Sequence, residues 1–349
     1  GRNALEANTT GSTNTSVGRN SLNANTTASE NTAVGRSAGS ATTTGALNAF
    51  FGAYAGTANT TGTQNTAIGQ AAFRTNTTGS QNTAVGREAM QDSTTANGNT
   101  AIGTRALADN TTGASNTAVG ENAADTATSA HNLTAIGKAA LTAVTTGSDN
   151  IGIGYTAGQV LTTGTYNILI GRDAGQSLTT GGSNHLIGAY TETSAADSSQ
   201  QLVLGYNVTG NENASFCFGN AGLDSAISFG ATSISAPSDE RMKEEITTST
   251  AGLSFVNDLR PVTFKWKKEK DIPTDLKGYV EDSEIRYKTE ATEHGFIAQE
   301  VKTAIDAHPE LKDGFNMWKE DEVDGRQRIG DGALVPMLVK AIQELSAKV

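Results

Sequence analysis

The segment from Ser238 to Lys243 places a serine hydroxyl and a lysine amine five residues apart, with Asp239 and Arg241 between them. A serine becomes a nucleophile when a neighbouring base removes its proton, and lysine serves as that base only where burial or a nearby cation lowers its pKa. Such a pair can cut a peptide bond. The spacing alone does not single these residues out, because exposed serines and lysines are common on protein surfaces.

The other residue types that carry chemistry are scattered along the chain. Cys217 is the single cysteine, which excludes an intrachain disulfide and a multi-cysteine zinc site. The four histidines form no ligand cluster, so we expect neither a metal nor a cofactor. A glycan-degrading site needs paired carboxylates. The acidic residues of the first part of the chain are scattered instead: Glu121, Asp125, Asp149 and Asp173.

Charge and hydropathy exclude two further classes of function. The chain has 25 basic and 36 acidic residues, a net charge of −11, and no basic patch interleaved with aromatic residues. This composition argues against nucleic acid as a partner. No apolar run is long enough to span a membrane, so we expect no membrane insertion.

Thirteen glycines, from Gly1 to Gly205, recur every 17 residues without an insertion; we call them the register glycines. A repeat this short is stable only when it stacks on its neighbours. The residue before each later glycine is apolar: Val17, Val34, Phe51, Ile68, Val85, Ile102, Val119, Ile136, Ile153, Ile170, Ile187 and Leu204. That regularity excludes a linker, and the Thr, Asn and Gly content excludes a helical repeat. We predict a mainly β fold, a β-solenoid or β-roll fibre with two short strands in each repeat.

The predicted core of one repeat is thin. We expect the branched residue before each glycine, and the alanine three residues after it, to point inward. One chain would then bury little apolar area for each residue that it orders. Association of identical chains would bury more, and we expect a homotrimer; a solenoid that is stable as a monomer remains the alternative.

Composition divides the chain. All five prolines and both tryptophans lie at position 237 or later, and 40 of the 61 charged residues lie in the last 112. We assign residues 1–205 to the repetitive β fibre, 206–237 to an irregular end with a closing strand and a linker, and 238–349 to a small α+β domain that ends in a helix. Because Gly1 is already in register, we expect a missing N-terminal part before it.

Two parts of the sequence resemble known families. The 17-residue unit, as in NTAIG at 65–69, resembles repeats of trimeric phage tail fibres and of trimeric bacterial adhesin heads. Residues 238–349 resemble the peptidase S74, or intramolecular chaperone, domain of phage tail spikes and fibres. Four motifs carry this resemblance, in order: SDERMKEEI at 238–246, GLSFVNDLRPVTFKW at 252–266, HGFIAQEV at 294–301 and ALVPMLVKAIQEL at 333–345.

The resemblance implies that the C-terminal domain trimerises, sets the register of the fibre and then cuts itself off. By resemblance the cut falls at the Pro237–Ser238 bond, with Ser238 as nucleophile and Lys243 as base. Asp239 is expected to orient the loop and Arg241 to help lower the pKa of Lys243. Such a domain meets a physical need, because in a uniform fibre a slipped coil is nearly as stable as the correct one.

These features predict a structural host-attachment fibre of a phage tail, carried on the virion and made in the host cytoplasm. The expected partners are its own copies, a host-surface glycan or protein receptor, and other tail proteins bound through the missing N-terminal part. The only enzymatic activity expected is one self-cleavage. The alternatives are a trimeric bacterial surface adhesin, an uncleaved fibre with a permanent trimerisation cap, a glycan-degrading tailspike and an ice-binding solenoid.

Overall fold

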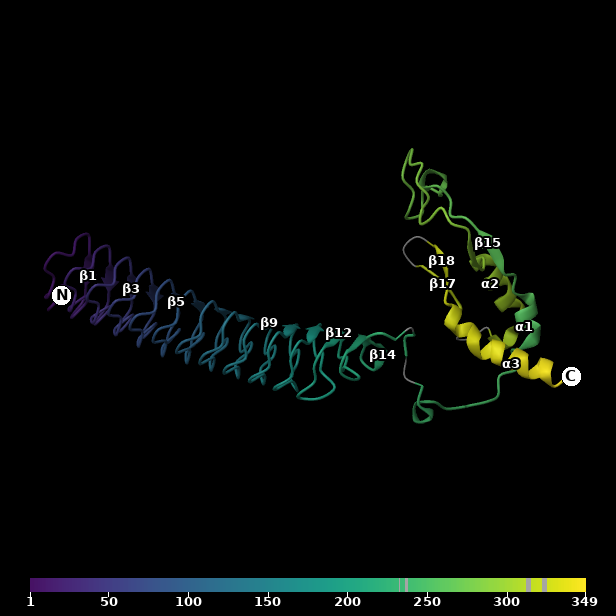
Figure 1. Cartoon of the computed structure of the whole chain (residues 1–349), viewed down its shortest axis with the longest axis horizontal. Coiled ribbons are helices and arrows are strands. Elements are labelled where there is room, and N and C mark those ends of the chain that lie inside the picture. The colour runs from purple at the N-terminus through teal and green to yellow at the C-terminus, as the bar shows by residue number, and fades with distance from the viewer. Residues whose placement is uncertain (232, 236–237, 312–314, 322–324) are drawn as a thin grey trace. The chain divides into compact units, whose positions relative to one another are not determined.

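The computed structural model describes residues 1–231, 233–235, 238–311, 315–321 and 325–349. It divides the chain into two compact units, Gly1–Ser238 and Asp239–Val349. The first unit is a β-solenoid, which we call the shaft, and the second is a small unit of short helices and strand pairs (Figure 1). The predicted mainly β fold is confirmed, with its 17-residue spacing and its C-terminal helix.

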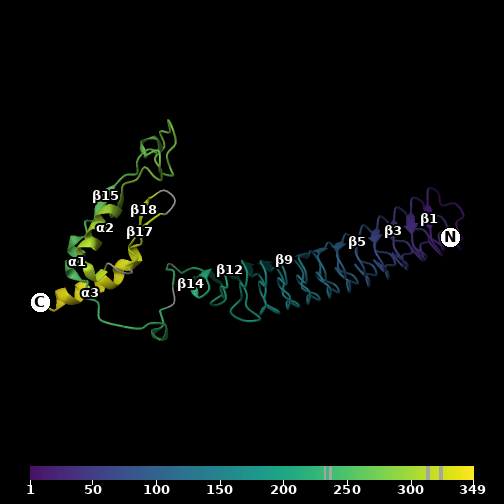
Figure 2. The same ribbon diagram turned by 180° about the vertical axis from the view of Figure 1, so that it is seen from behind.

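Each coil of the shaft contributes one three-residue strand to a single parallel sheet. Both ribbon views show the strands stacked one after another along the shaft (Figure 1 and Figure 2). Successive strands pair with a shift of one repeat, so that Thr66 lies opposite Thr83. The strands are β1 Thr15–Val17, β2 Thr32–Val34, β3 Ala49–Phe51, β4 Thr66–Ile68, β5 Thr83–Val85, β6 Thr100–Ile102, β7 Thr117–Val119, β8 Thr134–Ile136, β9 Ile151–Ile153, β10 Ile168–Ile170 and β11 His185–Ile187.

The rest of each coil consists of turns, so the prediction of two strands in each repeat was wrong. In one coil Gly86 has φ +138°, Glu88 +58° and Met90 +49°. Residues with positive φ bend the chain and cannot continue a strand. Their N–H groups bond to the neighbouring coils instead, from Glu88 to the Gln70 carbonyl at 3.0 Å and from Met90 to the Ala106 carbonyl at 2.9 Å.

The register glycines are required at a point where the backbones of stacked coils approach each other closely. Gly69 has φ +137°, and a Cβ atom added to it would lie 2.4 Å from the carbonyl oxygen of Gly86. Neither the backbone conformation nor the space accepts another residue. This double requirement explains why the 17-residue spacing is unbroken.

The strands bury their central residue and expose the branched residues, which corrects the predicted orientation. Ala67 at the centre of β4 is fully buried, whereas the neighbouring Ile68 is 42% exposed. Side chains alternate between the two faces of a strand, so Thr66 shares the outer face with Ile68. The alanines three residues after the register glycines are buried as expected, for example Ala72 and Ala89.

One turn position supplies many of the large interior side chains. The residue four positions after the register glycine is large and fully buried in several coils: Leu22, Phe73, Met90, Leu107 and Leu141. Where the strand itself carries the large residue, as at Phe50, this turn position holds glycine in the same coil and in the next. A Cβ atom on Gly39 or Gly56 would come within 2.6 Å of the Phe50 ring. Because the interior is narrow, one large residue fills the space that a second would need.

A row of buried asparagines, one residue before most strands, ties the coils together. The Asn48 N–H donates to Oδ1 of Asn31 at 2.9 Å, and the Asn48 Nδ2 donates to the Gly62 carbonyl at 2.9 Å. The same bonds recur from coil to coil, for example from the Asn65 N–H to the Asn48 Oδ1 at 2.9 Å. Buried amides that are bonded in this way satisfy polar backbone groups that no strand pairs.

The shaft ends in three longer strands: β12 Gln201–Tyr206, β13 Ser215–Asn220 and β14 Leu223–Ser228. In the parallel β12–β13 pair, Gln201 lies opposite Ser215, so the 17-residue register is lost here. The last strand, β14, contains Ile227 and pairs antiparallel with β13. The antiparallel strand therefore ends the parallel series.

The C-terminal unit packs three short helices around a small core. Its elements are η1 Glu240–Met242, α1 Leu253–Asp258, β15 Val262–Phe264, η2 Glu269–Asp271, β16 Glu293–Gly295, α2 Ala298–Ala307, η3 Pro309–Leu311, β17 Trp318–Glu320, β18 Gln327–Ile329, η4 Asp331–Leu334 and α3 Val335–Ser346. The core includes Phe255 from α1, Val301 and Ile305 from α2, and Met337 from α3. Ile297 precedes α2 as its N-cap residue and is 37% exposed.

Helix α3 leaves an apolar face uncovered. Met337 and Ala341 pack on the unit's own core, as does Leu334 just before the helix. Five apolar residues of the helix are exposed: Val335, Leu338, Val339, Ile342 and Leu345. These residues therefore cover little of their own unit.

Because a large side chain from either the strand or the turn fills the same space, loss of one should be compensated by addition of the other. Phe50→Ala should destabilise the shaft by about 3–5 kcal/mol because it opens a cavity. Adding Gly39→Leu should recover at least half of that loss, because Leu22 and Leu107 hold this turn position at φ +45° and +50° beside strand alanines. Urea denaturation followed by circular dichroism measures both changes. Gly39→Leu with Phe50 intact should destabilise the shaft by overpacking, and a neutral result would contradict this account.

Candidate functional site

The predicted nucleophile and base lie where the two units meet in the sequence. Ser238 is the last residue of the shaft unit, and Lys243 follows the one-turn 3-10 helix η1. Both side chains are exposed. Pro237, the other half of the predicted cleavage site, lies outside the described residues.

Asp239 and Arg241 order the turn between these two residues. The Asp239 carboxylate accepts a hydrogen bond from the Arg241 backbone N–H at 2.9 Å and another from the Arg241 Nε at 3.0 Å. The side-chain bond to Arg241 lowers the pKa of the Asp239 carboxyl, and the same bond raises the pKa of Arg241. The Arg241 charge is thus directed toward Asp239, which holds η1 at its N-terminus.

The surroundings limit what a single chain can do at this segment. A lysine general base needs a partly buried or cation-rich environment. In the single chain every residue from Ser238 to Ile246 is exposed. The segment therefore supplies the reactive residue types but not the burial that a lysine base needs.

The polar residues of the third motif have structural contacts. His294 lies on β16 opposite Thr263 of β15. Glu300 on α2 accepts a hydrogen bond from Arg260 Nε at 2.9 Å, and this bond lowers the pKa of Glu300. An open hollow of about 480 Å³ lies over the β15–β16 pair and is lined by residues 261–263 and 294–296. No carboxylate or lysine lines it, so it offers no pair for acid–base chemistry.

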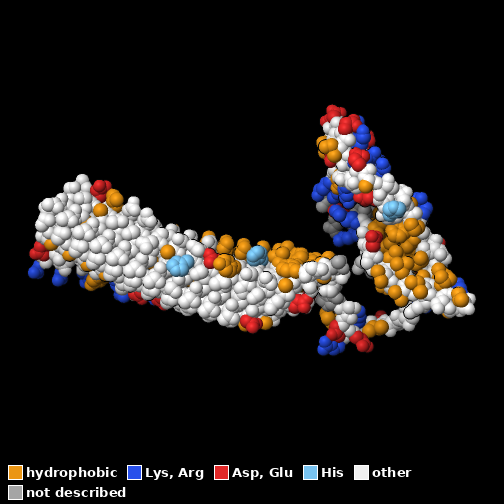
Figure 3. All heavy atoms as spheres, in the orientation of Figure 1, with side chains coloured by type: hydrophobic (Ala, Val, Ile, Leu, Met, Phe, Trp, Pro, Cys, Tyr) orange, Lys and Arg blue, Asp and Glu red, His pale blue; other side chains and the backbone are white. Residues whose placement is uncertain are grey.

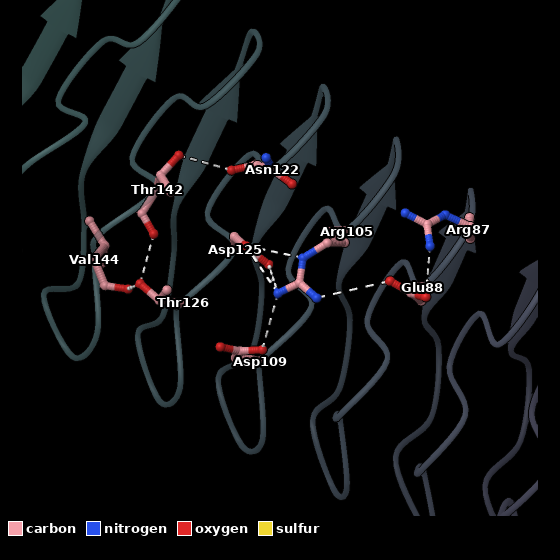
Figure 4. A network of polar contacts seen from close by, with 9 residues as sticks. All are labelled: Arg87, Glu88, Arg105, Asp109, Asn122, Asp125, Thr126, Thr142 and Val144. Carbon is pink, nitrogen blue, oxygen red and sulfur yellow. Dashed lines mark hydrogen bonds and ion pairs between the residues drawn. The ribbon is translucent and has the colours of Figure 1, made fainter.

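Three carboxylates of the shaft, Glu88, Asp109 and Asp125, are held in an ion-pair network rather than in a catalytic pair. Arg105 Nη2 lies 3.1 Å from Asp125 and 3.9 Å from Asp109, while its Nη1 lies 3.9 Å from Glu88 (Figure 4). Burial raises the pKa of Asp125, although the Arg105 charge opposes that shift. One guanidinium thus balances carboxylates from neighbouring coils, and nothing in this arrangement favours glycan hydrolysis.

The part of the chain that the structure describes also bears on metal sites and on membrane spans. There, no group of three or more His, Cys, Asp or Glu side chains is placed to hold a metal ion. None of the described helices is both long and apolar enough to cross a membrane.

Comparison with known families accounts for the motifs at the start of the C-terminal unit. Residues 238–309 match the peptidase S74 family model, described as "Chaperone of endosialidase". The first part of the C-terminal unit is thus similar to this family. No curated protein and no solved structure matches the chain. The recognised resemblance is confirmed, since a β-solenoid of 17-residue repeats with a C-terminal chaperone domain fits a tail fibre.

The matched chaperone segment begins at Ser238 and contains the first three of the four motifs. Its start coincides with the boundary between the two compact units, Gly1–Ser238 and Asp239–Val349. The candidate nucleophile thus stands at the junction between shaft and chaperone, the place where a single cut would separate them.

The structure also reveals a buried histidine that the sequence did not single out. His308, just after α2, contacts Asp258 Oδ2 through Nε2 at 2.8 Å and Glu310 Oε1 through Nδ1 at 2.9 Å. Its ring packs edge-on against Phe255 at 5.4 Å. Asp258 ends α1 and lies 50 residues away in sequence, so no local pattern indicated the contact. His308 joins two helices of the chaperone segment.

The His308 contacts predict a pH dependence of the C-terminal unit. Hydrogen bonds to Asp258 and Glu310 raise the pKa of His308. The stabilisation is complete below the unfolded pKa of about 6.5 and is lost as the pH rises through the higher folded pKa. The unit should therefore resist urea better at pH 6 than at pH 9, and His308→Gln should remove most of that difference.

Tryptophan fluorescence of the full chain measures this effect, because both tryptophans, Trp266 and Trp318, lie in the C-terminal unit. His294→Gln is the control, since His294 is exposed on β16. An unchanged pH dependence in His308→Gln would rule out His308 as its source.

Proposed function

We propose that this chain is the shaft and C-terminal chaperone of a phage tail fibre that attaches the virion to a host cell surface. One observation carries the proposal. A solenoid of regular 17-residue coils leads, at Ser238, directly into a segment that matches the chaperone of endosialidase family. A long repetitive rod suits reach and display, and the domain that follows it suits assembly.

A homotrimer is the form we propose for the fibre. Successive coils repeat the same strand register and the same asparagine bonds, so the shaft has little means of choosing one alignment of neighbouring chains over the next. A C-terminal unit that associates first would fix that alignment. The exposed apolar residues on α3 give it a surface for doing so.

Attachment to a host receptor follows from the regularity of the shaft in this proposal. A rod of several chains presents many equivalent surfaces, and weak contacts to a surface glycan or protein add up when several are made at once. The other tail proteins would join the fibre at its N-terminal side.

In the proposed self-cleavage, Ser238 Oγ attacks the carbonyl carbon of Pro237 while Lys243 accepts the hydroxyl proton. The peptide C–N bond breaks, an ester forms between Pro237 and the Ser238 side chain, and the freed Ser238 amine takes up a proton. Water then hydrolyses the ester and leaves a carboxylate on the shaft. Because the single chain exposes both residues, we propose that assembly of several chains covers them and so activates the pair.

Denaturing mass spectrometry tests the self-cleavage. The wild-type chain of 35.9 kDa should split at Pro237–Ser238. Ser238→Ala should abolish the cut, and Lys243→Arg should slow it at least a hundredfold, because arginine keeps the charge but stays protonated.

Ser233→Ala is the matched control, since Ser233 is also exposed and lies five residues before Ser238. It should be cut like the wild type. If the wild-type chain also stays whole after assembly, the C-terminal unit is instead a permanent trimerisation cap.

Receptor attachment predicts that the purified shaft adsorbs to bacterial cells of the host. Soluble surface polysaccharide should release it if the receptor is a glycan, whereas protease treatment of the cells should abolish binding if the receptor is a protein. Co-sedimentation with intact cells measures both. A shaft that binds neither untreated host cells nor their isolated surface polysaccharide would contradict the attachment role.

A further inference from the structure

The outer face of the shaft sheet carries an uninterrupted apolar column. The column consists of the branched or aromatic residues before the register glycines, from Val17 to Leu204, one in each of twelve coils. Seven of them are 38–56% exposed: Val17, Phe51, Ile68, Ile102, Ile136, Ile187 and Leu204. An apolar surface of this length on a single chain indicates an interaction site.

The same face widens toward the C-terminal end of the shaft. Two residues before the column, the outward position holds threonine in most coils from β1 to β8. From β9 onward it holds Ile151, Ile168, His185, Leu202 and Phe216. The widened end, β9 to β13, therefore shows two adjacent apolar columns that only His185 interrupts, and Figure 3 shows hydrophobic side chains gathering in this part of the shaft.

Charged residues are absent from both outward positions of strands β1 to β12. They begin after the register glycine, for example at Arg36, Arg87 and Lys138. The surface thus has an apolar centre with a charged edge, the distribution that protein interfaces show. Its size also suits an interface. The seven column residues that are 38–56% exposed, with the five others that are partly exposed, supply an area on the order of the 800 Å² that a standard interface buries on each partner.

The period of the column indicates what covers it. Parallel strands stack about 4.8 Å apart, so the column presents one apolar side chain at that interval over roughly 55 Å. A partner that fills it must repeat at the same interval over the same length. A second copy of this chain does so by construction, whereas a globular protein or a soluble glycan does not.

We propose that the outer sheet face of the shaft is the contact surface between identical copies of the chain, and that the contact is strongest at the widened end. This inference rests on the proposed multi-chain fibre and names the surface that holds it together. The widened end is the part of the shaft nearest in sequence to the chaperone segment. Copies that the chaperone has aligned would therefore meet first where the apolar surface is broadest.

Cysteine labelling on the assembled full chain tests the surface. In a Cys217→Ser background, Ile102→Cys places a thiol in the column and Thr95→Cys places one on another exposed position of the same coil. Light scattering gives the number of chains, and maleimide labelling gives the accessibility of each thiol. We expect a multi-chain assembly in which Ile102→Cys reacts at least tenfold more slowly than Thr95→Cys, and both react alike after unfolding.

The outcomes separate this inference from the proposed function. A multi-chain assembly in which both thiols react at the same rate overturns the interface and leaves the fibre proposal standing. A chain that stays monomeric at micromolar concentration overturns both, while the self-cleavage assay is read independently.

Two double variants test the same surface by adding lysine charges to it instead of a thiol. Ile68→Lys with Ile102→Lys should abolish assembly, whereas Thr61→Lys with Thr95→Lys adds the same charge to the same coils and should leave it intact. Circular dichroism checks that both variants fold. Equal effects of the two pairs on assembly would overturn the interface.

A more conservative triple variant tests the widened end with substitutions that the fold of a coil already accepts. Ile151→Thr, Ile168→Thr and Leu202→Thr together install the residue that seven coils already carry at this position: Thr15, Thr32, Thr66, Thr83, Thr100, Thr117 and Thr134. Dissociation of the assembly, measured by light scattering on dilution, should increase at least tenfold. The control, Val34→Thr, Val85→Thr and Val119→Thr, should have a smaller effect. The reverse order would overturn the claim that the widened end dominates.

Discussion

The close stacking of coils is the constraint on which the shaft depends. At each register glycine the backbones approach so closely that a side-chain carbon on Gly69 would lie 2.4 Å from the next coil's carbonyl oxygen. This contact fixes the repeat at 17 residues and requires glycine at one place in every coil. It also explains why left-handed residues recur, since the chain must turn several times to return to the same point one layer on.

The narrow interior that results determines which residues of the strands are exposed at the surface. Beside the strand a coil has room for one large side chain, supplied by the turn position four residues after the register glycine in several coils and by the strand at Phe50, Leu169 and Leu186. The central strand residue is therefore small in many coils, and the branched residues that favour a strand are directed outward. A shaft of this design is stable through hydrogen bonds between coils, yet it leaves a column of branched residues partly exposed to water. Solenoids with this arrangement gain from association along their length.

A uniform shaft specifies the alignment of neighbouring chains poorly, and in the proposed fibre the C-terminal unit supplies that specificity. Coils with the same register and the same asparagine bonds give neighbouring chains few cues for alignment. The C-terminal unit is irregular by contrast. His308 joins Asp258 across 50 residues, and Glu344 on α3 accepts a hydrogen bond from the Leu253 N–H at 2.9 Å. In the proposed fibre, the alignment of neighbouring chains is therefore set by the part of the chain that does not repeat.

The sequence by itself determined the period, the solenoid class, the C-terminal helix and the chaperone family, because register glycines and ordered motifs are local signals. It did not determine which way the strand side chains point, and the prediction for Ile68 was wrong. A one-residue shift exchanges the two faces of a strand, and only the packed interior selects one. The sequence also missed the second column at Ile151 and the buried His308. Both arise from residues far apart in the chain, which tertiary structure alone brings together.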